Sequence, residues 1–551
     1  MKTRKLVALA VAVLMLTSMA STIAAATEAS PFPPMEPLSP EKVTFTAFIA
    51  QQPTGMTDIT TNTFTLWLES VTNVHLDMDV VQTDGMKDKL TLMLASNDYP
   101  EIILAGAGDN AFKIADLVKY GTDEGILIPL NDLIEQYGTN IKARWAENPR
   151  IKEQMTAKDG NIYAIPSIDS GGISHGNVGV KLWMNQQWLD NLGLDMPTTT
   201  EEFKNVLIAF KTQDPNGNGI ADEIPLTGAI NTWCGDPYIF LLNAFDYYDP
   251  YTPIKLKDDV ISLCANTEGF KEGLKYIKDL YENDLIDPAS LTQNEQQMSA
   301  IGNNKDAVIV GAATCGHMAM FIDITNLDLS KQYDNIFPLE GSNGYRGIPY
   351  TTQPSASDFQ FAITDKCENP EIAIQWADLF CGEEVSVLGS VGVQGKQWDL
   401  ADPGTFGMDG ITTAKYKYGE AYYDSSADAN DAWGWALKLI QPDYKDLFQV
   451  DGDIYDPSNY EARLWQATAK LRPYAADVQQ IPNLWLSGDD SARISALETP
   501  LKDYIKTSIV EFITGKKDID ADWDAYINGL NKLGAEEYIA LYQAAYDALE
   551  N

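Results

Sequence analysis

Apolar and polar residues follow two different periods in the first part of the chain. Residues 43–49 and 75–81 have strand-length apolar or alternating patterns, whereas residues 64–72 and 86–96 repeat apolar positions at helical spacing. A short apolar run follows at residues 100–104. Strand, helix and strand in succession predict a parallel sheet with helices on its faces. The chain is therefore expected to be an α/β protein.

The apolar run at residues 100–104 leads into a glycine-rich turn that ends at Asp109. Ligands of α/β sheets bind beyond the carboxyl ends of the strands. Asp109 is therefore a candidate ligand-binding residue.

A third predicted helix begins near residue 200. Thr199 and Glu202 have the spacing of a capping box, and apolar residues from Phe203 to Phe210 form one stripe. The last 50 residues again have apolar positions at helical spacing. Residues 400–435, in contrast, are rich in Asp, Gly, Ala and Tyr without a period, which predicts an irregular excursion over the surface or the mouth of a cleft.

Directly after the helix that begins near residue 200, oxygen-bearing side chains occupy alternate positions around a glycine turn. Calcium prefers six to eight oxygen ligands, and the EF-hand loop supplies them at positions 1, 3, 5, 7, 9 and 12 with glycine at position 6. Here Gly219 occupies the turn position, and Pro225 stands where the twelfth ligand would be. A neighbouring glutamate is therefore needed to close the site. The predicted Ca²⁺ ligands are Asp214, Asn216, Asn218, the Ile220 carbonyl, Asp222 and Glu223.

The alternative for this loop is a turn without metal, because Asp, Asn and Gly favour turns by themselves. The loop lies at the end of a capped helix. If it binds calcium, we therefore expect the ion to have a structural role rather than to act as a switch.

The N-terminus has the pattern of an export signal. Lys2, Arg4 and Lys5 precede an apolar run, and Ala24 and Ala26 have the spacing that signal peptidase recognises. About 525 residues remain, enough for two or more folded lobes. The net charge of −40 becomes −43 once the three cations of the signal are removed. Such a surface repels nucleic acid and anionic lipid, so no nucleic-acid partner is expected.

Other catalytic and metal motifs are weak or absent. Five scattered cysteines without a Cys-x-x-Cys pair form no recognisable disulfide framework or zinc site, although one pair could bridge. Ser174 lies in a G-x-S-x-G sequence, but a strand rather than a helix is predicted after it, which argues against an esterase.

Aromatic residues are frequent, with 12 Trp and 26 Tyr, and such side chains can stack on sugar rings as well as pack in cores. Trp233, Trp398, Trp433 and Trp435 lie beside glycine or aspartate in loop-like sequence. Ordinary packing is the alternative for each of them. The candidate ligand-binding residues are Asp109, His175, Trp233, Asp236, Trp398 and Trp433.

With these segments in view, the chain resembles bacterial extracellular solute-binding proteins of the family 1 type, the capture subunits of ABC importers for oligosaccharides. Within the family it looks closest to the large calcium-loop members related to the alginate-binding proteins and the LplA-like lipoproteins. The resemblance is carried, in order, by LASNDYPEII at 94–103, IPLNDLI at 128–134, DGNIYAIP at 159–166, WLDNLGL at 188–194, the loop at 214–225, GVQGKQW at 392–398, FITG at 512–515, Trp523, Tyr526 and QAAY at 543–546.

The resemblance implies a two-lobed periplasmic-binding-protein fold (type II) whose lobes are joined by a hinge of three crossings, near residues 166–176, near residues 351–359 and after Trp398. It also implies structural calcium in the loop. The expected division is a signal peptide at 1–26, a flexible leader at 27–40, a first lobe at 41–166 and 356–398, and a second lobe at 167–355 and 399–551.

The expected function is to capture a carbohydrate through aromatic and polar residues of the cleft. The protein would then deliver it to the permease subunits of an ABC importer, without catalysing a reaction. We expect a monomer that the signal peptide directs to an extracellular or periplasmic location. The signal contains no lipobox cysteine, which favours a form without a lipid anchor. In addition, Asn185, Gln186 and Gln187 stand where relatives often have a basic residue, which disfavours transfer of an anionic-sugar site. The alternatives are a secreted polysaccharide-cleaving enzyme, or the same scaffold binding peptide or another nutrient.

Overall fold

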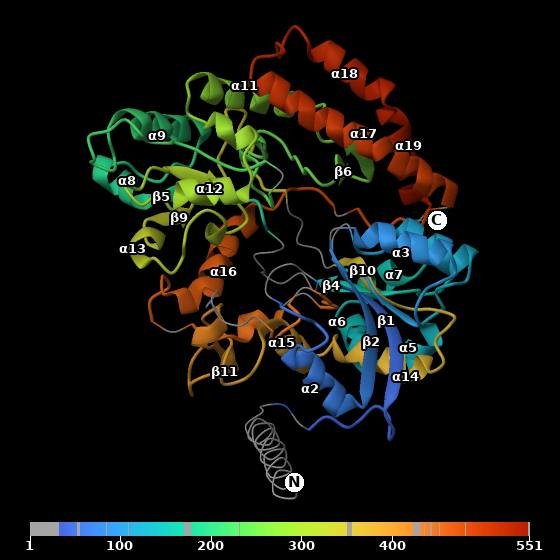
Figure 1. Cartoon of the computed structure of the whole chain (residues 1–551). Coiled ribbons are helices and arrows are strands. Elements are labelled where there is room, and N and C mark those ends of the chain that lie inside the picture. The colour runs from blue at the N-terminus through green and yellow to red at the C-terminus, as the bar shows by residue number, and fades with distance from the viewer. Residues whose placement is uncertain are drawn as a thin grey trace, which may run out of the picture.

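The two lobes of the protein are visible in a computed structural model of the chain, one built mainly from blue, cyan and amber elements and the other from green and red ones (Figure 1). The structure describes residues 32, 34–51, 56–83, 85–107, 110–169, 178–230, 232–349, 355–422, 430–434, 436–440, 443–450, 452–479, 481–486 and 488–548. The predicted signal peptide therefore lies outside the described residues.

The first lobe is built on a five-stranded sheet with the order β2-β1-β3-β10-β4. Its strands β1, β2 and β3 are parallel, as the sequence predicts, whereas β10 pairs antiparallel with both β3 and β4. The sheet is therefore mixed. Its strands are β1 Val43–Gln51, β2 Val74–Gln82, β3 Ile102–Leu104, β4 Ile165–Asp169 and β10 Ser355–Ile363.

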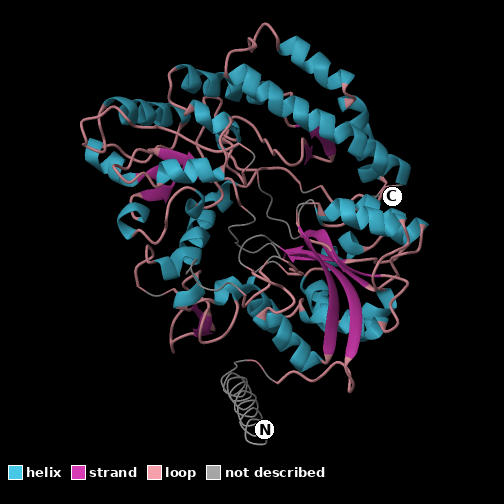
Figure 2. Ribbon diagram, viewed as in Figure 1, coloured by secondary structure: helices cyan, strands magenta, loops and turns pink. Residues whose placement is uncertain are grey.

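Helices cover this sheet in the first lobe (Figure 2). The predicted helices at 64–72 and 86–96 are present, and each buries one apolar face against the sheet. The helical segments are α2 Thr63–Thr72, α3 Met86–Ala95, α4 Ile114–Leu117, the π-helix η2 Val118–Asp123, α5 Asn131–Tyr137, α6 Thr139–Glu147, α7 Pro149–Met155, α14 Pro370–Leu379 and α15 Glu383–Val391.

The second lobe has a small antiparallel sheet of order β8-β5-β9 and a separate hairpin, β6-β7. The predicted capping box begins α9: Thr199 Oγ1 accepts from Glu202 N, and Glu202 Oε2 accepts from Thr199 N, both at 3.2 Å. The strands are β5 Leu182–Asn185, β6 Ile254–Lys257, β7 Val260–Leu263, β8 Ala312–Thr314 and β9 Tyr333–Asn335.

Most of the second lobe is helical, and its longest helix, α17, packs against α11 and α19. The α-helices are α8 Gln186–Leu192, α9 Thr200–Thr212, α10 Pro237–Leu242, α11 Glu268–Glu282, α12 Glu295–Gly302, α13 Leu327–Ser330, α16 Tyr460–Leu471, α17 Gly488–Ile513, α18 Trp523–Lys532 and α19 Ala535–Asp547. The short 3₁₀ turns, which are not confined to this lobe, are η3 Pro288–Leu291, η4 Met318–Met320, η5 Glu420–Tyr422, η6 Asp443–Leu447, η7 Pro457–Asn459 and η8 Arg472–Tyr474.

The excursion that follows residue 398 packs on the first lobe, which corrects the predicted boundary at that point. Its hairpin, β11 Trp398–Leu400 with β12 Tyr416–Tyr418, and the residues up to Phe448 share one hydrophobic cluster with the five-stranded sheet. The physical reason is aromatic packing, because the Trp433 ring meets the rings of Phe64 and Phe380 at centroid distances of 5.5 and 5.6 Å. The second lobe resumes only at α16.

The end of the predicted flexible leader also packs against this excursion. The Phe32 ring lies 6.0 Å from the rings of both Trp398 and Tyr416, and Leu38 N donates to Thr72 O at 3.0 Å. Residues 27–31 lie outside the described residues.

The chain passes between the lobes beside α16. Tyr460 belongs to a hydrophobic cluster of the second lobe, and Ala462 belongs to the cluster of the first. The two other predicted crossings contain residues 170–177 and 350–354, which lie outside the described residues.

A later segment contacts the first lobe again. Asn483 Nδ2 donates to the carbonyls of Gln154 and Ala356, at 3.1 and 2.8 Å, and Trp485 is buried against Phe359. The lobes therefore share contacts beyond the predicted crossings.

Candidate functional site

The indole of Trp233 lies in the loop before α10 and rests on the backbone of two glycines. A Cβ added at Gly316 would overlap the indole ring, and one added at Gly179 would come within 2.9 Å of it. The ring is still 38% exposed, and it lies 6.0 Å from the His317 ring. A flat aromatic surface supported from behind and open to solvent is suited to stacking on a sugar ring.

Three residues later, Asp236 occupies the N-cap position of α10 without capping it. Pro237 follows at the first helical position, and the Asp236 side chain makes no capping hydrogen bond. The residue is only 8% exposed, and its Oδ1 has no hydrogen-bond partner among the described residues. A buried acceptor without a donor costs about 1–3 kcal/mol, so this carboxylate is suited to meet a donor from a ligand.

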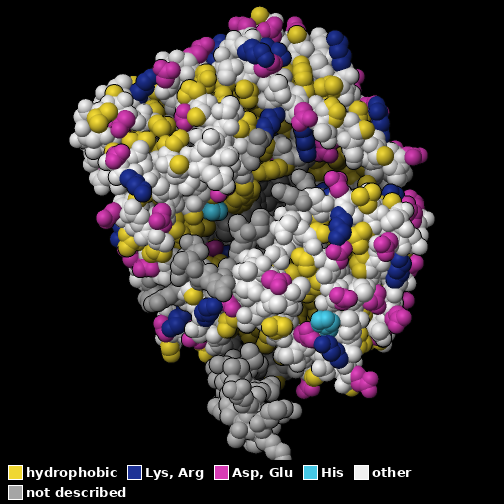
Figure 3. Space-filling model, in the orientation of Figure 1, with side chains coloured by type: hydrophobic (Ala, Val, Ile, Leu, Met, Phe, Trp, Pro, Cys, Tyr) yellow, Lys and Arg dark blue, Asp and Glu magenta, His cyan; other side chains and the backbone are white. Residues whose placement is uncertain are grey.

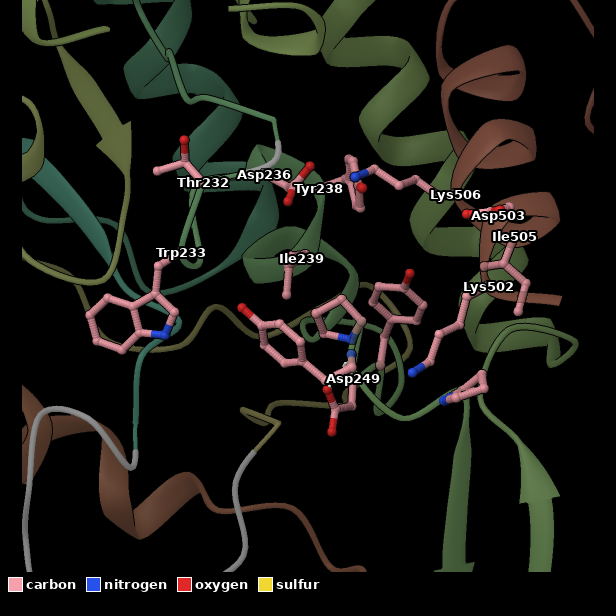
Figure 4. A pocket seen from close by; sticks show the side chains of 14 residues that line it. Thr232, Trp233, Asp236, Tyr238, Ile239, Asp249, Lys502, Asp503, Ile505 and Lys506 are labelled. Atoms are coloured by element: carbon pink, nitrogen blue, oxygen red, sulfur yellow. Dashed lines mark hydrogen bonds between the residues drawn. The ribbon is translucent and has the colours of Figure 1, made fainter. Parts of the chain in front are cut away.

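Trp233 and Asp236 line the same pocket, which has a volume of about 380 Å³. In the close view, Lys506 extends from α17 toward Asp236 and Tyr238, with Trp233 at the other end of the group (Figure 4). The pocket is lined by Thr232, Trp233, Asp236, Tyr238, Ile239, Tyr248, Asp249, Pro250, Tyr251, Pro253, Lys502, Asp503, Ile505 and Lys506.

The pocket belongs to the second lobe but lies near the first. Its wall is formed by α17, which also contacts α4 of the first lobe. The space-filling view shows the surface hollowed between the lobes, with apolar side chains along the wall of the second lobe (Figure 3). Pockets at the junction of two lobes are common ligand sites.

Burial shifts the acidic groups of the pocket. It raises the pKa of Asp249 to about 6, although the Tyr251 N–H donates to Asp249 Oδ1 at 2.8 Å and Lys502 opposes the shift. Burial also raises the pKa of Asp236, and the charge of Lys506 works in the opposite direction. A lysine of α17 thus acts on each carboxyl group, although the direct ion pair of Lys502 is with Glu498 at 2.6 Å.

Behind Trp233, His317 packs between the indole and the first residue of α16. Its Nδ1 lies 3.3 Å from Tyr460 Oη, and that oxygen also accepts from Ala319 N at 2.9 Å. Burial lowers the pKa of His317 to about 4. The aromatic platform is therefore in contact with residues that lie next to a crossing between the lobes.

The other predicted ligand-binding residues do not join this pocket. Trp398 and Trp433 are 1% and 2% exposed, and their indole nitrogens donate to Gly392 O and Thr65 Oγ1 at 2.8 and 2.6 Å. Both are core residues of the first lobe, which corrects their assignment as sugar platforms. Asp109 and His175 lie outside the described residues, as do Ser174 and Trp435.

Pocket residues such as Asp249, Tyr251 and Lys506 are not recognisable from the sequence. The spacing of Lys502 and Lys506 places both on one face of α17, but that pattern is typical of any solvated helix. They reach the pocket only because α17 packs beside the loop at 232–253.

The predicted calcium loop is a compact turn in which several of the expected ligand residues hydrogen-bond to one another. Asn218 N donates to Asp214 Oδ1 and Asn216 Oδ1 at 3.1 and 3.0 Å, and Gly219 N donates to Asp214 Oδ2 at 3.1 Å. Asn218 Nδ2 contacts both carboxylate oxygens of Asp222. Gly219 has φ 76°, a conformation that suits the turn position because glycine carries no Cβ.

Glu223 provides a test of whether this residue set fits a cation. Its Oε1 is buried without a hydrogen-bond partner among the described residues, and burial together with the charges of Asp222 and Asp214 raises its pKa. A cation would satisfy that oxygen and offset the repulsion. No group of three or more His, Cys, Asp and Glu in the described part of the chain is placed to hold a metal by itself, so amide and carbonyl oxygens have to contribute.

All five cysteines are described, and all are free thiols, so the possible cysteine bridge is not formed in this structure. Across the described segments, no helix is long and apolar enough to cross a membrane.

Two α/β lobes around a pocket-bearing cleft define the class of two-lobed periplasmic substrate-binding proteins. The model of the family described as bacterial extracellular solute-binding protein matches residues 39–386. The chain therefore belongs to this family, and the resemblance drawn from the sequence is confirmed.

The relatives include oligosaccharide-binding proteins. The chain is 29% identical to the fructooligosaccharide ABC transporter substrate-binding protein FusA of Streptococcus pneumoniae serotype 4 over 514 residues, which cover 92% of this chain and 90% of FusA. The structure of FusA with kestose matches with a TM-score of 0.75 at 27% identity, covering 92% of this chain and 99% of FusA. An EF-hand mutant of FusA with fructo-nystose matches equally well, with the same TM-score, identity and coverage.

A more distant structure supports the fold. The alginate-binding protein AlgQ2, solved without calcium ion, matches with a TM-score of 0.66 at 20% identity, covering 93% of this chain and 99% of AlgQ2. These relatives are binding proteins.

Proposed function

We propose that this protein captures an oligosaccharide between its lobes and delivers it to the transmembrane subunits of an ABC importer, without converting it chemically. The observation that carries the proposal is the pocket in which the exposed indole of Trp233 lies near the buried carboxylate of Asp236. Stacking on the aromatic face and hydrogen bonds to hydroxyls are complementary ways of binding a sugar.

A ligand that binds the closed arrangement of the lobes more tightly than the open one shifts the protein toward the closed form. The pocket lies wholly on the second lobe, so closure would add contacts from the first lobe and exclude water. The closed form is the one we propose to be presented to the permease. We further propose that the protein acts as an exported monomer outside the cytoplasmic membrane.

Titration of the purified protein with a panel of oligosaccharides, peptides and other nutrients tests this function. Intrinsic tryptophan fluorescence and calorimetry should show saturable binding of an oligosaccharide, and small-angle scattering should show compaction in the same samples. The mixture should contain no new reducing ends after prolonged incubation. New reducing ends would show that the protein is a polysaccharide-cleaving enzyme, and binding of peptides alone would assign it to a different nutrient.

For the loop at 214–223 we propose structural calcium. Asp214, Asn216, Asn218, the Ile220 carbonyl, Asp222 and Glu223 would hold the ion, which would neutralise the carboxylates and fix the turn after α9. Support comes from the hydrogen-bonded turn that the loop forms around Asp214, from the buried Glu223 Oε1 and from the EF-hand of FusA.

Chelation with EDTA should destabilise the protein by about 2–3 kcal/mol when compared with calcium at 100 times its dissociation constant, because binding to the native state stabilises it by mass action. Differential scanning calorimetry measures this loss. Glu223→Gln should reduce the calcium-dependent gain, whereas Asp524→Asn, an exposed change on α18, should keep it. Equal melting temperatures with calcium and with EDTA would contradict the assignment.

A further inference from the structure

The charges that line the pocket restrict the kind of sugar it can take, and this step rests on the proposed function. All fourteen lining residues are described, and none is an arginine. Arginine is the side chain that recognises carboxylates with two parallel hydrogen bonds, so the pocket lacks the usual means of binding a uronic acid.

The two lysines that do line the pocket face carboxyl groups of the protein. Burial raises the pKa of both Asp236 and Asp249. The positive charges of Lys506 and Lys502, respectively, oppose part of that rise. Lys502 Nζ also pairs with Glu498 Oε1 at 2.6 Å, so the positive charge of both lysines is offset by carboxylates of the protein. Asp503 adds a further carboxylate to the lining. An anionic ligand would find no net positive charge there.

One oxygen of Asp236 lacks a donor, although the carboxyl group has a side-chain hydrogen bond with Tyr238. Its carboxylate is 8% exposed in the pocket lining, and its Oδ1 has no hydrogen-bond partner among the described residues. A sugar hydroxyl placed against the part of this side chain that lines the pocket can donate a hydrogen bond to the carboxylate, whereas a ligand carboxylate placed there would be repelled.

We propose that this pocket binds a neutral, hydroxyl-rich sugar unit and discriminates against uronic acids, with Asp236 as the residue that determines this specificity. The overall charge of −40 acts in the same direction, since it opposes the approach of polyanions over longer distances.

The test compares two sets of ligands on the unchanged protein by calorimetry: neutral tri- and tetrasaccharides that include kestose, and an oligogalacturonate of the same length. At least one neutral oligosaccharide should bind, and the galacturonate should bind about 100-fold more weakly, because like charges brought together cost several kcal/mol. The affinity for the neutral ligand should change little with salt, since no net charge is neutralised on binding.

Asp236→Asn should weaken binding of the neutral oligosaccharide about 10- to 100-fold, the range for loss of a hydrogen bond to a charged group. The matched control is Asp88→Asn, which removes the same charge from an exposed position on α3 and should leave the affinity unchanged. Thermal melting of both variants checks that they are folded.

The outcomes separate two kinds of failure. Equal or tighter binding of the galacturonate, or unchanged affinity in a folded Asp236→Asn variant, overturns the inference and leaves oligosaccharide capture intact. If none of the neutral or acidic oligosaccharides binds, the proposed function fails, and the inference fails with it.

Discussion

Trp233 in the second lobe and Trp433 in the first lobe have similar local sequences and opposite environments. Each lies beside glycine or aspartate outside any helix or strand, yet Trp233 is 38% exposed and Trp433 is 2% exposed. The surroundings make the difference. Trp233 is supported on its inner side by the backbone of Gly316, whereas Trp433 lies among the rings of Phe64, Trp376 and Phe380.

This contrast teaches that an aromatic residue in a loop can serve as a binding surface only where the packing of the chain leaves part of it exposed to solvent. The two tryptophans should therefore respond to substitution in opposite ways. One should matter for folding and the other for ligand binding.

The largest effect is expected for Trp433→Ala. Removing a large buried aromatic side chain costs about 3–5 kcal/mol, because the cavity left behind collapses only in part. Urea unfolding should show this loss, while the protein that remains folded should bind oligosaccharide with unchanged affinity.

Trp433→Phe is the control for this change and should lose less stability, since it retains an aromatic ring. A stable Trp433→Ala variant that no longer binds sugar would reverse the roles of the two residues.

A smaller effect, on binding, is expected for Trp233→Ala. Loss of a central aromatic contact should weaken oligosaccharide binding by about 2 kcal/mol, or about 30-fold, as is typical of aromatic residues that dominate a binding site. The melting temperature in the absence of ligand should change little, because part of the ring is already solvated. Fluorescence titration and thermal melting measure the two quantities.

Gly316→Ala tests whether the position of this ring matters as well as its presence. The added methyl group would overlap the Trp233 indole and displace it, so affinity should fall although the tryptophan is retained. Wild-type affinity in both Trp233→Ala and Gly316→Ala would remove Trp233 from the site.

The smallest effect is expected for the pH dependence of stability and comes from His317, whose ring lies beside Trp233. The pKa of His317 is about 4 in the folded protein, below the value near 6.5 expected when unfolded, because burial disfavours the charged ring. The unfolded state therefore binds more protons between these values, so stability should fall as the pH falls. The contribution of His317 is about 1.4 kcal/mol between about pH 7.5 and pH 5.5.

His317→Gln should remove this part of the pH dependence when stability is measured by urea unfolding across that range. Nearby charges on Glu461, Lys181 and Lys445 act on His317 and are kept in the variant, so the difference between the two profiles isolates the histidine. Parallel profiles for the two proteins would show that His317 does not titrate as stated.

Much of the fold could be predicted because periodic elements carry their own signal. The strands at 43–49 and 75–81 and the helix at 86–96 match β1, β2 and α3 within a few residues. The lobe boundary after residue 398 could not be predicted in the same way. Residues 400–435 have no period, and their place in the first lobe depends on contacts with residues hundreds of positions away, such as Trp433 with Thr65.

The candidate site was predictable only in part. Trp233 and Asp236 were recognisable as polar and aromatic loop residues, and the structure places both in one pocket. Lys502 and Lys506 were not recognisable as site residues, because a lysine pair on a helix has the same sequence pattern whether it faces water or a pocket. The loop at 214–223 was readable for the opposite reason, since the spacing of its Asp, Asn and Gly residues is a signal within one short segment.

The sequence by itself determined the α/β class, the family and the oxygen-rich loop, because each depends on residues that are close together in the chain or on motifs in a fixed order. Only the tertiary structure decided which tryptophan is open to solvent, which carboxylate oxygen lacks a donor and which lysine charges act on the buried carboxylates. These properties depend on what packs around a side chain, and its neighbours in space come from segments far away in the sequence.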